Sequence, residues 1–508
     1  MPGTGDHADM TRHHVRGSAL LLVGRILSLL ISTATQIIIV RALTKVEYGG
    51  FAYALALASA GRTLLSLGQG KLLSRFMAGY EEQRDYNRMF GSMVLAIGTI
   101  VVTSTLTMVA LFAFSDVLIF SAVQDSRAVA VVLILVFVAP MEALDQVFVS
   151  LFAVFSRPLA IFFRKFLLSP LLRFGVVLLL VITDASVILL AIGYVISGLV
   201  GLLVYVGILI RVLRERDLLK ELKPRKLIMP YRAVFGFSFP LITGELVLLS
   251  LNTGGVLVLV YFQPIVEVAS YRAVFNGARL NTAILTAFTT LFLPMAARLF
   301  ARSDIDGLRR TYWHSAAFVA VLTFPIFALT GPLAPQTTVL LFGARYADSS
   351  AVLALLAVGY YFNVMLGFNA FTLQVCGRIR YLVGVNVFVA LLNIAVSLLL
   401  VRDFGAVGIA AANCVALATQ NILNQLALRR SIGTGFIARR YLGCYLLIAL
   451  FSAALWAFQL LIEPSLLLSL AAATVASCAL LMSCRNVMGL AESFPELSKV
   501  PVVRWLIR

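Results

Sequence analysis

The chain has 508 residues, of which 61% are hydrophobic and 13% are charged, and its mean hydropathy is +0.98. A soluble domain would carry about 25% charged residues. Apolar stretches long enough to cross a bilayer recur along the whole chain, which predicts a polytopic membrane protein. This composition excludes a soluble enzyme, a secreted disulfide scaffold and a nucleic-acid-binding protein.

Charged residues and Pro or Gly clusters divide the apolar sequence into segments of spanning length. The first seven are 17–40, 50–69, 89–114, 128–154, 158–182, 187–210 and 233–261. The last seven are 268–297, 311–334, 349–376, 381–401, 405–428, 441–462 and 465–484. A membrane barrel would instead show strands of about 10 residues with alternating polarity. We therefore expect an all-α fold with about 14 transmembrane helices.

The positive charges indicate how these helices are oriented. The formal net charge is +18, and most of the 41 Lys and Arg residues fall in one set of alternate loops and tails. The opposite set of loops holds Arg41, Lys45, Arg127, Arg345 and Arg402. By the positive-inside rule, the rich set is cytoplasmic. We expect a multi-pass protein of the cell (inner or plasma) membrane, with the tails 1–16 and 485–508 both in the cytoplasm.

The sequence also contains an internal repeat at an offset of 220 residues. Gly24 aligns with Gly244, Thr33 with Thr253, and the run 178–181 with 398–401. Repeats of six helices have the same topology, so a pseudo-two-fold axis along the membrane normal should relate them, as in transporters built from two rocking halves. Such repeats place the substrate at their interface.

The repeat predicts the domain organisation. We expect an N-lobe of six helices at 17–210, a basic cytoplasmic linker at 211–232, and a C-lobe of six helices at 233–428. Two additional helices at 441–484 lie outside the repeat.

Two corresponding helices carry polar stripes. In the first helix, spacings of three and four residues place Arg25, Ser28 and Ser32 on one face. In the seventh helix, a spacing of seven residues likewise places Glu245 and Asn252 on one face. The offset of 220 places Arg25 opposite Glu245 and Ser32 opposite Asn252. We therefore expect these residues to line a cavity.

Further arginines stand within spans, where a charged side chain costs at least about 2.5–3.5 kcal/mol and marks a functional site by default. Helix 8 carries Arg272, Asn276 and Arg279 on one face, and helix 2 carries Arg62. Structural ion pairs or snorkelling towards the interface are the alternatives. Guanidinium groups in a cavity suit phosphate or pyrophosphate. We expect Arg25, Arg62, Arg272 and Arg279 to bind such a group.

Two acids in helix 4, Glu142 and Asp145, lie three residues apart on one face. They are candidates for coupling transport to protons or sodium. Structural pairing with Arg173 or Lys165 is an equally good interpretation.

Other chemistry has no support in the sequence. Gly70-Lys71 is followed by Leu72 and lacks the glycine spacing of a nucleotide-binding loop. No metal-binding or catalytic motif occurs, so we expect no enzyme, no cofactor and no metal.

Several segments resemble the polysaccharide-export flippases of the multidrug/oligosaccharidyl-lipid/polysaccharide exporter superfamily. They are GRILSLLISTATQIIIVRALTKVEYGGFAYA, LGQGKLLSRFMA, VASYRAVFNGARL, LFLPMAARLFA and LLFGARYADSSAVLALLAVGYYF. The opening motif fits the O-antigen and exopolysaccharide branch best, whereas the two added helices look like those of lipid II flippases.

The resemblance implies a two-lobe bundle that alternates access and carries polyprenyl-pyrophosphate-linked glycans through a cationic cavity. Its partners would be the lipid-linked glycan, membrane lipids, and a polysaccharide polymerase or chain-length machinery. A lipid II flippase and an ion-coupled multidrug antiporter of the same fold are the alternatives. A membrane glycan polymerase or glycosyltransferase would need catalytic carboxylates on an outer loop, and the longest such loop, about 335–348, offers only Arg345 and Asp348.

Overall fold

The computed structural model describes residues 4–66, 69–113, 126–155, 157–184, 186–221, 224–231, 245 and 249–488. Within these ranges the secondary structure is helical and no strand occurs. The prediction of an all-α polytopic membrane protein is confirmed.

Ten of the described helices are long and apolar enough to cross a membrane, and the bent pair Ile265–Thr289 and Leu291–Ala301 would make an eleventh span. The expected segments 381–401 and 405–428 correspond to the two helical parts of α18 (Ile379–Ile432), which meet at a kink where Gly405 has non-helical φ and ψ angles. The expected segment 233–261 lies largely outside the described residues. The number fourteen and the two-fold relation of the lobes therefore stay predictions.

The chain divides into two compact units, Met1–Ala269 and Ser270–Arg508. The helices of the first unit are α1 (Thr4–Ala42), α2 (Lys45–Ser66), α3 (Gln69–Glu82), α4 (Tyr86–Ala113), α5 (Ser126–Leu135), α6 (Val138–Val154), α7 (Pro158–Ile161), α8 (Ser169–Thr183), α9 (Val187–Glu215) and α11 (Gly255–Phe262). This unit also contains the π-helices Phe162–Leu168 and Ser250–Gly254 and the 3₁₀-helices Leu218–Glu221 and Pro224–Lys226.

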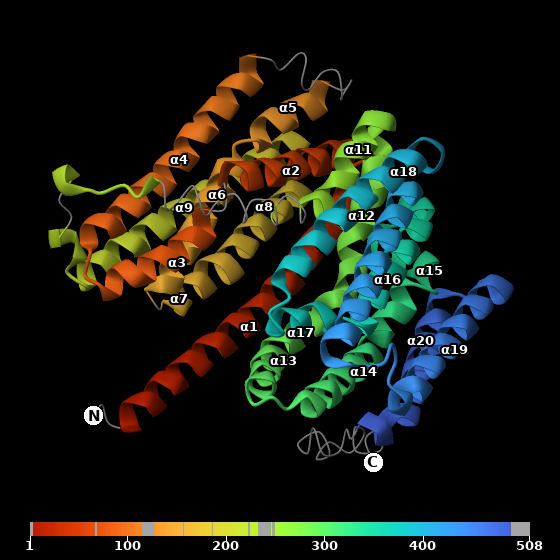
Figure 1. Ribbon diagram of the computed structural model, residues 1–508. Coiled ribbons are helices and arrows are strands. Elements are labelled where there is room, and N and C mark those ends of the chain that lie inside the picture. The colour runs from red at the N-terminus through yellow and green to blue at the C-terminus, as the bar shows by residue number, and fades with distance from the viewer. Residues whose placement is uncertain are drawn as a thin grey trace. The chain divides into compact units, whose positions relative to one another are not determined.

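Helix α6 lies in the middle of the first unit and packs against α2, α3, α4 and α9 (Figure 1). Helix α2 approaches its neighbours closely because its buried face is rich in Gly and Ala. A Cβ atom on Gly50 would lie 2.9 Å from the Cβ of Ala128, and one on Gly49 would collide with the carbonyl oxygen of Ile265. Small residues of this kind let helices associate inside a membrane, where burial of apolar area supplies no driving force. The same Ala-rich composition makes α2 less apolar than a typical span.

The span expected at 158–182 is interrupted by the π-helix Phe162–Leu168, which joins α7 to α8. The N–H of Ser169 donates to the carbonyl oxygen of Arg164, five residues earlier. Pro170 follows and has no N–H, so the regular α-helical ladder is already broken at this point. A π turn holds one residue more than an α turn, which changes the direction of the side chains around it.

The second unit is formed by the rest of the chain. Its helices are the second part of α12 (Ile265–Arg279), then α13 (Ala283–Ala301), α14 (Ile305–Thr330), α15 (Ala334–Phe342), α16 (Ser350–Met365), α17 (Asn369–Val375), α18, α19 (Arg439–Ile462) and α20 (Leu466–Met488), with the 3₁₀-helices Leu280–Thr282 and Ala344–Ser349. The expected outer loop at 335–348 is thus mostly helical.

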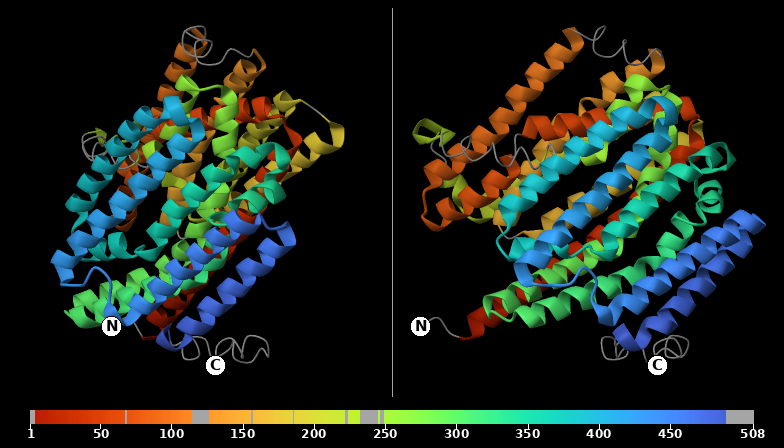
Figure 2. Two further views of the ribbon diagram at one scale, coloured as in Figure 1. Left: turned by 90° about the vertical axis from the view of Figure 1, so that its right-hand side faces the viewer. Right: turned by 45° about the vertical axis from the view of Figure 1, so that its right-hand side comes forward.

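Helix α14 is central to the second unit and packs against α13, α16, α19 and α20. Its buried rings include Tyr312, whose hydroxyl donates to Oε1 of Gln425 on α18 at 2.7 Å. Helices α19 and α20 lie side by side (Figure 2). Tyr445 of α19 donates to the carbonyl oxygen of Met365 at 2.9 Å, so the added pair is anchored to the lobe by a buried polar contact as well as by packing.

Candidate functional site

The first unit contains a cavity of about 410 Å³, and most of the residues that line it have polar or charged side chains. Its walls come from α1, α2, α6, α8, α9 and the π-helix. The lining residues are Ser28, Ser32, Arg62, Ser66, Glu142, Asp145, Gln146, Val149, Ser150, Arg164, Lys165, Ser169, Pro170, Arg173, Tyr205 and Glu245.

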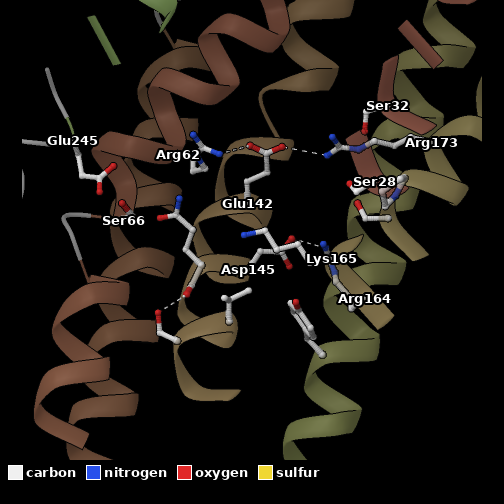
Figure 3. Close-up of a pocket in the computed structure, with 16 residues that line it drawn as sticks. Ser28, Ser32, Arg62, Ser66, Glu142, Asp145, Arg164, Lys165, Arg173 and Glu245 are labelled. Atoms are coloured by element: carbon white, nitrogen blue, oxygen red, sulfur yellow. Dashed lines mark hydrogen bonds and ion pairs between the residues drawn. The ribbon is translucent and has the colours of Figure 1, made fainter. Parts of the chain in front are cut away.

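Glu142 on α6 forms the centre of one ion network (Figure 3). Its Oε1 lies 3.2 Å from Nη2 of Arg173 on α8, and its Oε2 lies 3.6 Å from Nη1 of Arg62 on α2. The guanidinium of Arg173 also stacks on the ring of Tyr194 at 5.2 Å. Each oxygen of this carboxylate therefore pairs with a different arginine, and the two arginines come from different helices.

Asp145, one turn further along α6, pairs with a different arginine. Its Oδ2 lies 2.5 Å from Nη2 of Arg164, whose side chain is only 6% exposed. The guanidinium of Arg164 lies 4.9 Å from the centre of the Tyr205 ring. The close approach requires Gly201 on α9, where a Cβ atom would come within 2.5 Å of that guanidinium. Oδ1 of Asp145 and the hydroxyl of Tyr205 have no hydrogen-bond partner among the described residues.

Lys165 differs from these arginines because it forms no ion pair with any described residue. It lies on the π-helix, lines the cavity and is exposed. Arg25 on α1 is likewise exposed, lacks an ion pair within the described ranges, and is close enough for its charge to act on Lys165. Helix α1 can approach the π-helix closely because Gly24, next to Arg25, has no side chain. A Cβ atom at this position would lie 2.6 Å from the ring of Phe162.

The lining thus holds four cationic and three acidic side chains. Glu142 and Asp145 pair with the three arginines, so Lys165 and Glu245 are the remaining charged side chains of the lining, and Arg25 lies near Lys165 outside the lining. Such an arrangement can bind a polyanion with several guanidinium and ammonium donors. No cluster of His, Cys, Asp and Glu suited to a metal ion occurs in the described part of the chain.

Of the residues singled out from the sequence, the cavity brings together Ser28, Ser32, Arg62, Glu142, Asp145 and Glu245. Asn252 lies in the π-helix Ser250–Gly254, outside the lining. The sequence left open structural pairing of the two acids with Arg173 or Lys165. Glu142 pairs with Arg173, whereas Asp145 pairs with Arg164, and neither acid pairs with Lys165.

The three remaining candidates, Arg272, Asn276 and Arg279, belong to the second unit. There the guanidinium groups of Arg272 and Arg279 lie 5.2 and 5.8 Å from the ring centre of the buried Phe275. Arg279 and Asn276 are exposed. These residues form a second polar group on α12.

Sequence reasoning missed Arg164, and it considered Lys165 only as a structural partner of the two acids, because both basic residues lie within about two turns of the expected start of their span. It also missed Tyr205, which is an ordinary aromatic in an apolar helix. A basic pair followed by Ser-Pro within an apolar run was the available signal, since it breaks the helical pattern at charged residues.

Comparisons with known proteins bear on this geometry. The model of a family described as polysaccharide biosynthesis protein matches residues 14–300, which is more than half of the chain. No curated protein matches the sequence.

Solved structures of three transporters share the fold. A lipid II flippase, MurJ, in an inward closed conformation matches with a TM-score of 0.71 at 14% identity, over 95% of this chain and 99% of that chain. An inward-facing multidrug resistance MATE family transporter of the MOP superfamily matches with a TM-score of 0.64 at 15% identity, over 80% and 94%. A MOP superfamily transporter from Pyrococcus furiosus matches with a TM-score of 0.53 at 14% identity, over 83% and 95%.

Proposed function

The chain belongs to the polysaccharide biosynthesis protein family, and from this premise we propose that it is a flippase for a polyprenyl-pyrophosphate-linked oligosaccharide. It would move this lipid from the cytoplasmic to the outer leaflet by alternating access, for cell-surface polysaccharide synthesis of the O-antigen or exopolysaccharide type. The cationic cavity of the first unit is the observation that carries the proposal.

The ion pairs suggest how a diphosphate would enter the cavity. Lys165 and Arg25 have no carboxylate partner among the described residues, so they would make the first contacts. Arg62 and Arg173 are held by Glu142, at 3.6 and 3.2 Å, in the absence of substrate. A diphosphate oxygen would replace the carboxylate as acceptor for these two guanidinium groups. Glu142 then serves as the internal anion that keeps the arginines in position.

Two other transport functions make different demands on the site. A carrier of cationic drugs would need several carboxylates directed into the cavity, whereas two of the three acids of the lining, Glu142 and Asp145, are paired with arginines, and only Glu245 is not part of these ion pairs. A lipid II flippase would need the same diphosphate site, and it is favoured by the added helices α19 and α20 together with the fold shared with MurJ over nearly the whole chain. We keep lipid II as the second candidate substrate.

The remaining features of the proposal concern the cellular setting. We propose a location in the cell membrane with both chain termini in the cytoplasm, on the strength of the charge distribution. A polysaccharide polymerase or chain-length machinery would act on the product in the outer leaflet.

The test is a flipping assay in liposomes with a polyprenyl-pyrophosphate-linked oligosaccharide, lipid II and a cationic drug as separate substrates. We expect transport of the first substrate, and a loss of about tenfold or more in Lys165→Ala, as one charge-assisted contact is worth about 1.5–3 kcal/mol. Lys220→Ala removes a lysine outside the cavity and is the matched control. Transport of lipid II alone would establish the second candidate, and transport of the drug alone would reject both.

A further inference from the structure

A second cavity, of about 640 Å³, lies within the second unit where several candidate spans end. Helix α14 begins there at Ile305, α18 ends there at Ile432, and α19 begins there at Arg439. We define the basic rim pocket as the cavity lined by Arg309, Arg310, Trp313, His314, Arg440 and Tyr441, together with Met295 and the connector between α18 and α19. Because it lies at the ends of apolar helices, the pocket is at the level of a membrane–water interface.

The three arginines of the basic rim pocket differ in their contacts: one is held by hydrogen bonds and an ion pair, and two have no ion pair among the described residues. Arg309 is fixed: it donates from Nε to the carbonyl oxygen of Ile432 and pairs through Nη1 with Asp306 at 2.9 Å. Gly433 permits this contact, because its φ is +66° and a Cβ there would lie 2.7 Å from the guanidinium. Arg310 and Arg440 are exposed and form no ion pair with any residue that the structure describes. The pocket therefore presents two guanidinium groups without a counter-ion.

The backbone adds hydrogen-bond donors at the same place. Ala438 is the N-cap of α19, and no side chain caps this helix. The N–H of Tyr441 donates to the carbonyl oxygen of Ala438, and the N–H groups of Arg439 and Arg440 at the start of this 24-residue helix favour an anion, both as donors and through the helix dipole. His314 and Tyr441 lie beside these groups, and Nδ1 of His314 is 3.3 Å from the hydroxyl oxygen of Tyr441. The two side chains add polar groups to the lining of the pocket.

Large apolar side chains are exposed at the basic rim pocket and next to it in the sequence. Met295 lines the pocket and is 45% exposed. Phe436 and Ile437 do not line it but belong to the α18–α19 connector, between the lining residues Gly435 and Ala438, and are 39% and 40% exposed. The buried Trp313 forms the floor and is held by a hydrogen bond from Nε1 to Oγ1 of Thr434 at 2.7 Å. A small soluble anion would make no use of these exposed apolar side chains.

We propose that the basic rim pocket binds the phosphodiester headgroup of an anionic membrane phospholipid, with its acyl chains along Met295, Phe436 and Ile437. Arg310 and Arg440 bind the phosphate oxygens, the first turn of α19 donates amide hydrogen bonds, and Arg309 holds the connector in shape. Basic pockets between helices at the cytoplasmic surface suit such lipids. The site lies in a different unit from the cationic cavity and does not depend on the transported substrate.

The experiment measures binding of phosphatidylglycerol and phosphatidylcholine to the purified full-length protein by native mass spectrometry and by lipid-dependent thermal stabilisation. We expect the wild type to retain phosphatidylglycerol selectively. In R310A/R440A its affinity should fall about thirtyfold, because each basic residue near a membrane surface contributes about fivefold. R310K/R440K keeps both charges without the guanidinium forks and should bind better than R310A/R440A.

The matched control is R302A/R439A, which removes two exposed arginines, one at the end of α13 and one at the start of α19, whose side chains do not line the pocket. An equal loss in this control would overturn the proposal, since the binding would then be diffuse surface attraction. Displacement of the lipid by glycerol 3-phosphate or inorganic phosphate at equal concentration would also overturn it, in favour of a soluble phosphate ligand.

A measurement on the unmodified protein covers the case in which R310A/R440A does not fold. A photoactivatable phosphatidylglycerol should cross-link within residues 309–315 and 433–441. Cross-linking confined to other segments contradicts the assignment.

Discussion

Arg164 and Asp145 form the most buried ion pair of the cationic cavity, with Nη2 of the arginine 2.5 Å from Oδ2 of the aspartate. The pair leaves Oδ1 of Asp145 without a hydrogen-bond partner among the described residues. Glu142, by contrast, uses both of its oxygens. This asymmetry distinguishes two acids that are equivalent in the sequence, and it leads to the first two predictions.

Gly201→Ala should destabilise the protein, because the added Cβ would lie 2.5 Å from the guanidinium of Arg164 and displace it from Asp145. Separating a buried ion pair costs about 3–5 kcal/mol when one charge is left uncompensated. The measurement is thermal unfolding in detergent. Gly207→Ala, on the same helix with open space around it, should be neutral or slightly stabilising. Equal unfolding temperatures for both variants would show that Arg164 tolerates displacement.

Asp145 is the better of the two candidates for ion coupling, because its buried Oδ1 has no hydrogen-bond partner among the described residues and could therefore accept a proton. Asp145→Asn should abolish the dependence of transport on a proton or sodium gradient, measured in liposomes with imposed gradients. Glu142→Gln should instead weaken the hold on Arg62 and Arg173 and change the affinity for substrate. If Asp145→Asn keeps its gradient dependence, Asp145 is a structural partner of Arg164 only.

We predict that three arginines outside the cavity lining also contribute to diphosphate binding, namely Arg25, Arg272 and Arg279. Alanine at each position should reduce glycan transport, and lysine should restore part of it by keeping the charge without the guanidinium fork. The readout is transport by properly inserted protein at several substrate concentrations. Full transport by all three alanine variants would assign these arginines a structural role.

The predicted topology can be tested with single cysteines at exposed positions. Lys220→Cys, in the basic segment after α9, should react with a membrane-impermeant reagent only from the cytoplasmic side. Asp184→Cys, between α8 and α9, should react only from outside. Labelling of position 220 in intact cells would refute the orientation.

Net export should depend on the membrane potential. An interior-negative potential favours the outward movement of a diphosphate with about two negative charges. The gain is ~2.3 kcal/mol per charge per 100 mV, or about 4–5 kcal/mol in total at ~100 mV. Collapsing the potential with a potassium ionophore at constant pH and sodium should slow net flipping strongly. Flipping that responds to an ion gradient and not to the potential would indicate charge-compensated exchange.

The sequence by itself determined that the protein is an all-α membrane protein, because the length and composition of a membrane-spanning helix are dictated by the bilayer. It also identified Arg62, Glu142 and Asp145, since a charged side chain stands out in an apolar helix. The 14 spans followed from dividing the apolar sequence at charged residues and Pro or Gly clusters, the lobe boundaries followed from the internal repeat, and both stay predictions.

Only the tertiary structure decided which charges act together. The sequence did not single out Arg164 and offered Lys165 only as a structural partner of the two acids. The place of both residues in the cavity depends on the π-helix before Pro170 and on the approach of α6, α8 and α9. The partner of each acid was likewise undetermined, because the sequence offered Arg173 and Lys165 as partners and gave no sign of Arg164. Gly201 settles the choice: the absence of a side chain on α9 leaves the space that the guanidinium of Arg164 occupies beside Asp145.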